Sequence, residues 1–143
     1  MRSIYFFLVV CLVETVFAQQ REFAISWDAP KTLNNGISNL VIPNFNEVNF
    51  DFDGENLHFV AQWEETAPLQ PNSAQISRVV TSTIGQNELF DLPVSTIPEQ
   101  LEFSLKQTNS RGRIGMLLEL SPIIKTSRGF ERITSFVVTY QTS

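Results

Sequence analysis

The sequence predicts an all-β fold: an antiparallel β-sandwich of about seven to eight strands that follows a signal peptide. Apolar and polar residues alternate in several runs between Arg21 and Ser143, as in strands that bury one face. Clusters rich in Asn, Gly and Pro, such as those at 31–36 and 67–72, separate these runs. Only the stretch from Gln86 to Leu92 has the pattern of a short helical turn.

The first 18 residues are predicted to be a secretory signal peptide. Arg2 precedes an apolar stretch at residues 4–13, and a cleavage site follows at Ala18. A helix that spans a bilayer needs roughly 20 apolar residues, so this stretch is too short to be an anchor. We therefore divide the chain into a signal peptide, 1–18, and a β-sandwich domain, 19–143.

The single cysteine, Cys11, lies inside the predicted signal peptide. A lipoprotein signal needs a small residue just before the cysteine, and the bulky Val10 stands there, so we interpret Cys11 as an apolar residue of the signal helix. The domain that follows then has no thiol, and its core alone must hold it together. A chain of this size is long enough, because it buries roughly 60% or more of its unfolded surface.

The alternation assigns an inward face to each strand in the first half of the domain. The inward residues are Phe23, Ile25 and Trp27 in the first run, Val48, Phe50 and Phe52 in the second, and Leu57, Phe59, Ala61 and Trp63 in the third. Between the second and third runs, Asp53-Gly54-Glu55-Asn56 predicts a hairpin turn. Trp27 and Trp63 share faces with apolar neighbours, so we expect core residues rather than a platform for stacked sugars.

The second half contains four more predicted strands. They cover Ala74 to Gly85, which mixes β-branched and polar residues on both faces, then 101–106, 116–121 and the final run, which returns through a turn at Ser127-Arg128-Gly129. The first of these has Ile76, Val80 and Ile84 on one side and Val79 on the other. An apolar patch on a docking domain is expected to be exposed, so this strand is the predicted docking surface.

Charge and composition exclude several classes of function. The net charge is −5, and removal of Arg2 together with Glu14 leaves it unchanged, which argues against a nucleic-acid partner because such proteins need a basic patch. No apolar stretch after the signal peptide is long enough for a transmembrane helix.

No catalytic, cofactor-binding or metal-binding residue is predicted. His58 is the single histidine and lies on the polar face of its strand, with no cysteine partner and no Gly-x-Ser-x-Gly elbow in the chain. The run from Asp51 to Glu55 has the alternating carboxylates of a calcium loop, but Val60 stands where the distal glutamate should be. Arg111-Gly112-Arg113 has the composition of a protease processing site, but we prefer the interpretation of a solvated loop between two strands.

Several segments resemble the N-terminal region of PorU, the family of type IX secretion system sortases of Bacteroidetes. The segments are REFAISWDAPKTL at the start of the domain, FVAQWEE at 59–65, and LELSPIIKTSRGFERITSFVVTY at 118–140. The similarity includes Ile25-Ser26-Trp27 and Ser121 to Lys125, and it extends over essentially the whole domain. These motifs are structural, and none of them contains a catalytic residue.

The resemblance implies a large exported cysteine peptidase of the gingipain type, held at the outer membrane surface, that cleaves the C-terminal signal domains of secreted cargo. In that family the β-rich region comes first, and the peptidase domain with its His and Cys follows. Residues 19–143 would then be a leading domain, truncated from a longer protein. The implied partners are the peptidase domain of its own protein and outer-membrane components of type IX secretion. By itself such a domain would not be an enzyme.

Two alternatives come from the residues themselves. A free-standing secreted sandwich that binds glycan or protein would present Trp27, Trp63 or Tyr140 on an exposed aromatic patch. A small-ligand barrel would need a closed strand order around a cavity.

Overall fold

The computed structural model describes residues 16–34 and 36–143 and contains ten β-strands in this part of the chain. Its only helical elements there are three short 3₁₀ turns, labelled η. The all-β prediction is therefore confirmed, with more strands than the expected seven or eight. No helix in the described residues is long and apolar enough to cross a membrane. Residues 1–15, which include Cys11 and most of the predicted signal peptide, lie outside the description.

The elements follow one another along the chain with short connections. In order they are β1 (Phe17–Ala24), β2 (Trp27–Asn34), β3 (Asn39–Phe45), η1 (Glu47–Asn49), β4 (Phe50–Phe52), β5 (Leu57–Glu65), β6 (Gln75–Ile84), η2 (Gln86–Leu89), η3 (Val94–Thr96), β7 (Phe103–Ser110), β8 (Arg113–Leu120), β9 (Ile123–Thr126) and β10 (Gly129–Thr142).

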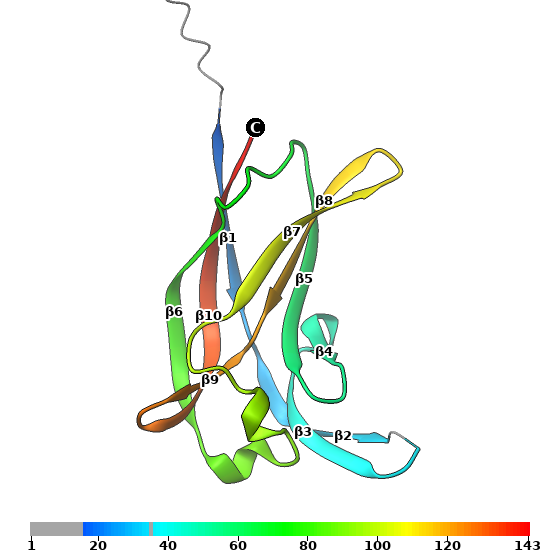
Figure 1. Cartoon of the computed structure of the whole chain (residues 1–143), viewed down its shortest axis with the longest axis vertical. Coiled ribbons are helices and arrows are strands. Elements are labelled where there is room, and N and C mark those ends of the chain that lie inside the picture. The colour runs from blue at the N-terminus through cyan, green and yellow to red at the C-terminus, as the bar shows by residue number, and fades with distance from the viewer. Residues whose placement is uncertain (1–15, 35) are drawn as a thin grey trace, which may run out of the picture.

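Two antiparallel sheets face each other (Figure 1). Sheet A has the order β1-β10-β6, and β9 also pairs with the lower part of β10. Sheet C has the order β4-β5-β8-β7. A separate hairpin, β2-β3, extends the molecule at one end. The long β10 runs through the middle of sheet A and pairs with the three other strands of that sheet.

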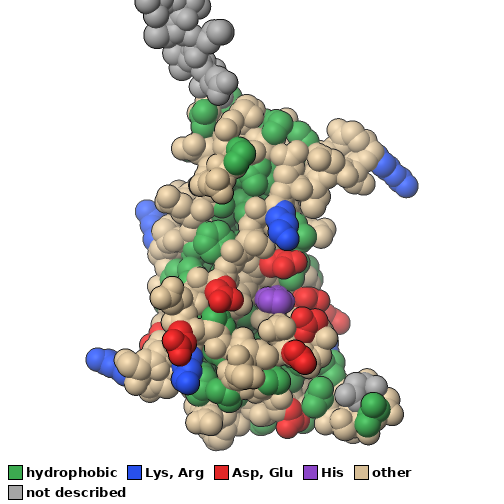
Figure 2. Space-filling view, viewed as in Figure 1, with side chains coloured by type: hydrophobic (Ala, Val, Ile, Leu, Met, Phe, Trp, Pro, Cys, Tyr) green, Lys and Arg blue, Asp and Glu red, His purple; other side chains and the backbone are tan. Residues whose placement is uncertain are grey.

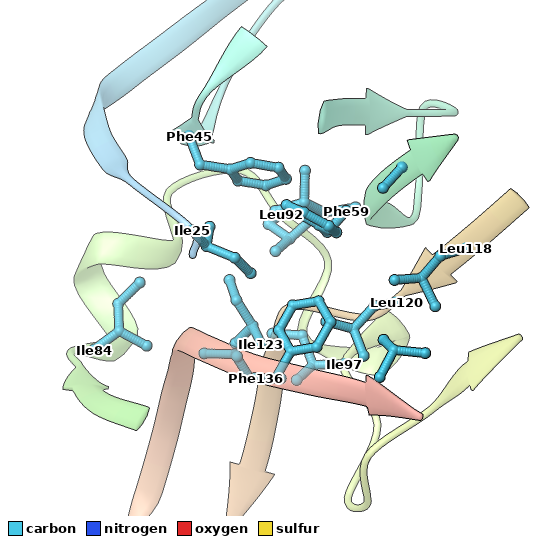
Figure 3. Close-up of a cluster of buried hydrophobic side chains, with 14 of the residues drawn as sticks. Ile25, Phe45, Phe59, Ile84, Leu92, Ile97, Leu118, Leu120, Ile123 and Phe136 are labelled. Carbon is cyan, nitrogen blue, oxygen red and sulfur yellow. The ribbon is translucent and has the colours of Figure 1, made fainter. Parts of the chain in front are cut away.

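Aromatic side chains from both sheets meet in the core. Phe23 of β1 stacks on Phe136 of β10 with ring centroids 5.4 Å apart, and Phe59 of β5 meets both rings edge-on. Phe45 from β3 stacks on the other side of Phe59. Around them lie the buried aliphatic residues of both sheets, among them Leu118 and Leu120 (Figure 3). Alternating inward residues from two sheets therefore interlock, as a sandwich requires.

The inward faces predicted for β5 and β8 are confirmed. Leu57, Phe59 and Ala61 are buried, and Trp63 packs against the same cluster. On β8, the predicted residues Met116, Leu118 and Leu120 are all buried. The hairpin between β4 and β5 also turns where predicted, with φ of +104° at Gly54, a value that favours glycine.

The first predicted strand is in fact two strands in different sheets. β1 ends at Ala24, after which the Ile25 amide still donates to Thr134 of β10, and the Ser26 carbonyl accepts from Asn46 beyond β3. Trp27 then opens β2, opposite Phe45. Phe23, Ile25 and Trp27 do face inward together, because the chain changes sheets without leaving the core.

The second predicted strand is shorter than expected. Val48 is 93% exposed in η1, so its predicted place beside Phe50 and Phe52 is wrong. Hydrogen bonds of asparagine side chains compete with the ladder here: the amide of Asn46 donates to Asn49, and the amide of Asn49 donates to the Val60 carbonyl at 2.9 Å.

Strand β3 was not predicted. Its sequence contains Pro43, which has no N–H for a ladder hydrogen bond. The register of β2 and β3 shifts at this point, with Ala29 and Pro30 lying opposite Pro43, so the prolines stand where the ladder is interrupted. The hairpin tolerates both of them because it has only two strands and each strand has an open edge.

Candidate docking surface

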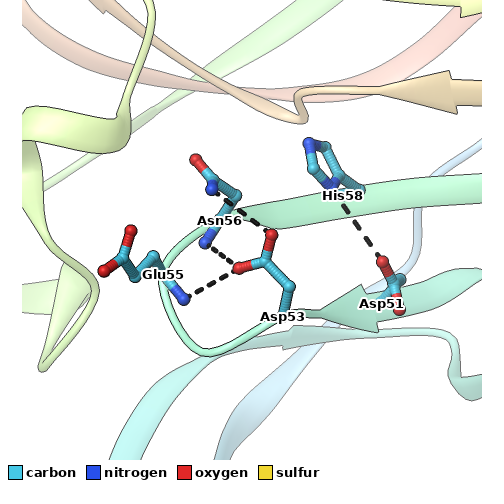
Figure 4. Close-up of polar contacts among 5 residues, drawn as sticks. All are labelled: Asp51, Asp53, Glu55, Asn56 and His58. Carbon is cyan, nitrogen blue, oxygen red and sulfur yellow. Dashed lines mark hydrogen bonds and ion pairs between the residues drawn. The ribbon is translucent and has the colours of Figure 1, made fainter.

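The polar hairpin end at β4–β5 is built by turn chemistry. The Asp53 carboxylate accepts hydrogen bonds from the backbone N–H groups of Asn56 at 2.7 Å and Glu55 at 2.9 Å (Figure 4). These two donors, Asn56 first, hold the pKa of Asp53 below its ordinary value because they favour the charged form. The carboxylate therefore caps the turn and keeps few lone pairs for another ligand.

His58 lies next to this turn on the outer face of β5. Its Nδ1 is 3.9 Å from a carboxylate oxygen of Asp51, its neighbour across the β4–β5 ladder, and 29% of the His58 side chain is exposed. Figure 2 shows acidic side chains gathered around the single histidine on this face. Within the described residues, no group of three His, Cys, Asp or Glu side chains is arranged to hold a metal ion.

The two tryptophans are packed residues, as predicted, and do not form an exposed platform. The Trp27 indole N–H donates to the Ile133 carbonyl at 2.8 Å, and that of Trp63 donates to the Tyr140 hydroxyl at 2.9 Å. An arginine covers each ring: Arg21 lies 4.8 Å from the centroid of Trp63, and Arg132 lies 5.6 Å from that of Trp27. Tyr140 itself is 2% exposed.

The arginines singled out in the sequence stand in the tight turn between β7 and β8. Arg111 and Gly112 form a two-residue turn with φ of +51° and +77°, the sign that a type I′ hairpin requires at both positions. This hairpin projects from the body of the molecule, and Figure 2 shows a basic side chain at its end. Arg113, at the start of β8, pairs with Glu64 at 3.2 Å on the exposed face.

An open hollow of about 680 Å³ lies beside this pair on the outer face of sheet C. Its floor is Gly115, where a Cβ would lie only 2.5 Å from the Thr108 hydroxyl oxygen. The lining is polar and mixed in charge, so it defines no particular ligand.

Strand β6 contains the docking surface predicted from the sequence. Its residues are divided between the two faces differently from the prediction. Ile84 is buried, but Val80 is 53% exposed, so these two residues do not share a side as predicted. The cause is a pair of register shifts: Arg78 and Val79 together lie opposite one residue of β10, and Thr134 is an extra residue on β10. Arg78 has φ of +50°, in keeping with a bulge.

The bulges create what we term the β6 surface. Val80 turns outward beside Ser135, next to Arg78 and to Glu22 of β1, around a hollow of about 410 Å³. Val79 is a further exposed apolar residue on the same strand, 37% exposed. Val137 forms part of the hollow, on the face opposite the core ring of Phe136. An exposed apolar centre flanked by one acidic and one basic residue is typical of a protein contact.

The class that the fold defines is an all-β antiparallel sandwich, with the β6 surface as a candidate docking site. No family model and no curated protein matches the chain. A similar solved structure is the complex of the RgpB pro- and mature domains from Porphyromonas gingivalis. The similarity covers 88% of this chain and 79% of the matched chain, with a TM-score of 0.51 and 8% sequence identity. At that identity the similarity is one of fold.

Proposed function

We propose that this chain is the non-catalytic leading domain of a sortase of the PorU type. Its parent protein would be exported to the periplasm or the cell surface and would associate with the outer membrane. There a gingipain-type peptidase domain would remove the C-terminal signal domains of secreted cargo. The described residues would contribute a surface for packing and no group to the chemistry.

The observation that carries this proposal is the fold match to a chain in a complex of a pro-domain with its mature domain, over 88% of the residues. The match supports a domain that packs against a peptidase domain. The finer assignment to type IX secretion rests on the sequence resemblance, from the Ile25-Ser26-Trp27 start to the segment at 118–140.

The β6 surface is the part of the molecule best suited to this contact. Its exposed valines offer apolar area to a partner, and Glu22 and Arg78 at its rim set the orientation of a contact through charge. We therefore assign the contact with the peptidase domain to β6 and the adjoining outer face of sheet A.

The first test is the DNA that follows the codon for Ser143, translated in frame. Several hundred further residues with a Cys and His peptidase domain are expected. An immediate stop codon, with no peptidase gene nearby, would remove the main support for the sortase and favour a small secreted module that binds a protein.

The second test measures the contact itself. The peptidase domain encoded downstream is titrated with this domain by calorimetry, using the wild type and Val80→Asp. The buried carboxylate should weaken binding at least tenfold, because a charge would be placed in an apolar contact without a partner. Val48→Asp introduces the same change at a 93% exposed position in η1, outside the β6 surface, and should bind like the wild type. Equal binding by all three proteins would overturn the assignment to β6.

A glycan-binding module has less support. Such a module would stack sugars on exposed aromatic rings, but Trp27, Trp63 and Tyr140 are held inside by hydrogen bonds or covered by arginines.

A further inference from the structure

Phe90 is presented to solvent by a turn that is anchored on both sides. Leu89, before it, and Leu92, after it, are buried in the core, and the Leu92 amide donates to the Leu89 carbonyl at 3.0 Å. The Phe90 side chain between them is 49% exposed. Two of the four turn residues thus hold the chain in place, and the largest side chain of the four points away from the core.

Asp91 fixes this turn to β3. Its backbone N–H donates to the Val41 carbonyl at 2.8 Å, and its carboxylate accepts from the Val41 amide at 2.7 Å. The backbone of Phe90 is consequently held at φ of +51° and ψ of −122°. These are the angles of the first central residue of a type II′ turn, a position dominated by glycine. A phenylalanine there is strained, and strain of this kind is concentrated at ligand-binding positions.

Beside Phe90 lies a hollow of about 170 Å³, which we term the Phe90 hollow. Its apolar wall is formed by Trp27, Pro30, Pro43 and Phe90 itself. Pockets for drug-sized ligands have roughly 300 to 1,000 Å³, so this one is suited to a single side chain.

Charged groups line the same hollow. Asp28 and Glu88 are exposed carboxylates, and neither has an ion-pair partner within 4.0 Å among the residues that the structure describes. The third charged group is Arg132, whose guanidinium lies over the Trp27 ring and whose Nε donates to the Ser82 hydroxyl at 3.1 Å. The two carboxylates outnumber the one guanidinium, so the hollow attracts a cation.

We propose that the Phe90 hollow is a docking site for a lysine or arginine side chain of a partner protein. The aliphatic stem of that side chain lies against Phe90 and the prolines, and the cationic head reaches Asp28 and Glu88. Arg132 already covers the Trp27 ring, so the aromatic face open to the incoming stem is that of Phe90. The site stands on its own geometry and does not depend on the sortase proposal or on the β6 surface.

The test uses the ¹⁵N-labelled exported protein and follows its two tryptophan indole N–H signals. The probes are N-acetyl-arginine amide and N-acetyl-lysine amide, and N-acetyl-citrulline amide is the neutral control of the same shape as the arginine probe. Both cationic probes should shift the Trp27 indole and the Phe90 amide in a saturable way, while Trp63 stays in place. No saturable shift, or an equal shift with citrulline, would overturn the proposal.

Variants separate the two parts of the site. Asp28→Asn combined with Glu88→Gln should weaken binding of the arginine probe at least fivefold. Phe90→Gly removes the apolar contact and should also weaken binding of the arginine probe. Glu55→Gln changes an exposed carboxylate at a distant hairpin and should leave the titration unchanged. An unaltered affinity in the double charge variant, with its spectrum otherwise preserved, would exclude a cation site.

Discussion

Tyr140 is the residue where burial and hydrogen bonding act most clearly together. Its hydroxyl donates to the Glu65 carboxylate and accepts from the Trp63 indole at 2.9 Å, so strands β5 and β10 of opposite sheets are joined by a partly buried polar bridge. Burial first, and then the hydrogen bond to Glu65, raise the pKa of the Tyr140 hydroxyl above its ordinary value of 10.0. The neutral phenol is the form that the folded state favours.

This shift predicts how stability responds to alkali. A group whose folded pKa is raised contributes stability that is fully present below the unfolded pKa, here about pH 10, and that is lost as pH rises through the folded pKa. Tyr5 lies in the predicted signal peptide, so a protein of residues 19–143 has Tyr140 as its single tyrosine. Phenolate absorbance should therefore show one transition above pH 10, and Glu65→Gln should move it to lower pH. A transition at or below pH 10 would contradict the buried bridge.

The strain at Phe90 predicts an unusual order of stabilities. Where φ is negative, replacing glycine by alanine stabilises a protein by about 0.4 to 1 kcal/mol, because the unfolded chain has less freedom to lose. At φ of +51° and ψ of −122° alanine keeps the strain and glycine relieves it. Phe90→Gly should thus be more stable than Phe90→Ala by about 1 kcal/mol. Urea unfolding of the two variants measures the difference, and a more stable alanine variant would place Phe90 in an ordinary conformation.

At the scale of elements, β6 shows where sequence patterning stops. Strict alternation places Ile76, Val80 and Ile84 on one face, and the alternation holds only between bulges. The residues that form the bulges, Arg78 and Thr134, are ordinary strand residues with no glycine or proline to mark them. The register depends on hydrogen bonds to β10, such as the Thr134 hydroxyl to the Val80 carbonyl at 3.1 Å, and those partners are far apart in sequence.

The altered register predicts that two similar substitutions in β6 change stability by very different amounts. Val80→Thr should change the free energy of unfolding by less than about 0.5 kcal/mol, because the side chain is half exposed. Ile84→Thr should cost about 2 kcal/mol or more, since it removes buried carbon and buries a hydroxyl. Thermal unfolding of both variants checks this. Equal losses would restore the single face that alternation alone predicts.

For the whole molecule, local pattern predicted the fold class and long-range pairing determined the rest. The turn at Asp53 to Asn56 and the inward faces of β5 and β8 could be predicted because each depends on neighbours in sequence. The division of 23–27 between two sheets could not, because it depends on β10, more than a hundred residues later. The Phe90 hollow was missed for the same reason: Trp27, Glu88 and Arg132 are distant in the chain and meet only in the folded state.

The stability of the whole domain depends on the rings that join its two sheets. Residues 16–143 contain no cysteine, so no disulfide supplements this core, and a reducing agent should leave unfolding unchanged. Phe59 is 1% exposed and contacts the rings of Phe23, Phe45 and Phe136.

Truncation of Phe59 should therefore loosen both sheets at once. Phe59→Ala is expected to cost about 3 to 5 kcal/mol, which is a large part of the roughly 5 to 15 kcal/mol that stabilises a typical domain. Urea unfolding of residues 19–143 measures this loss, with Val48→Ala as the control at a 93% exposed position, where a change within about 0.5 kcal/mol is expected. Among the described residues, Phe59 is the one ring that contacts both Phe23 of β1 and Phe45 of β3. If Phe59→Ala cost no more than the control, these ring contacts would not be the centre of the core.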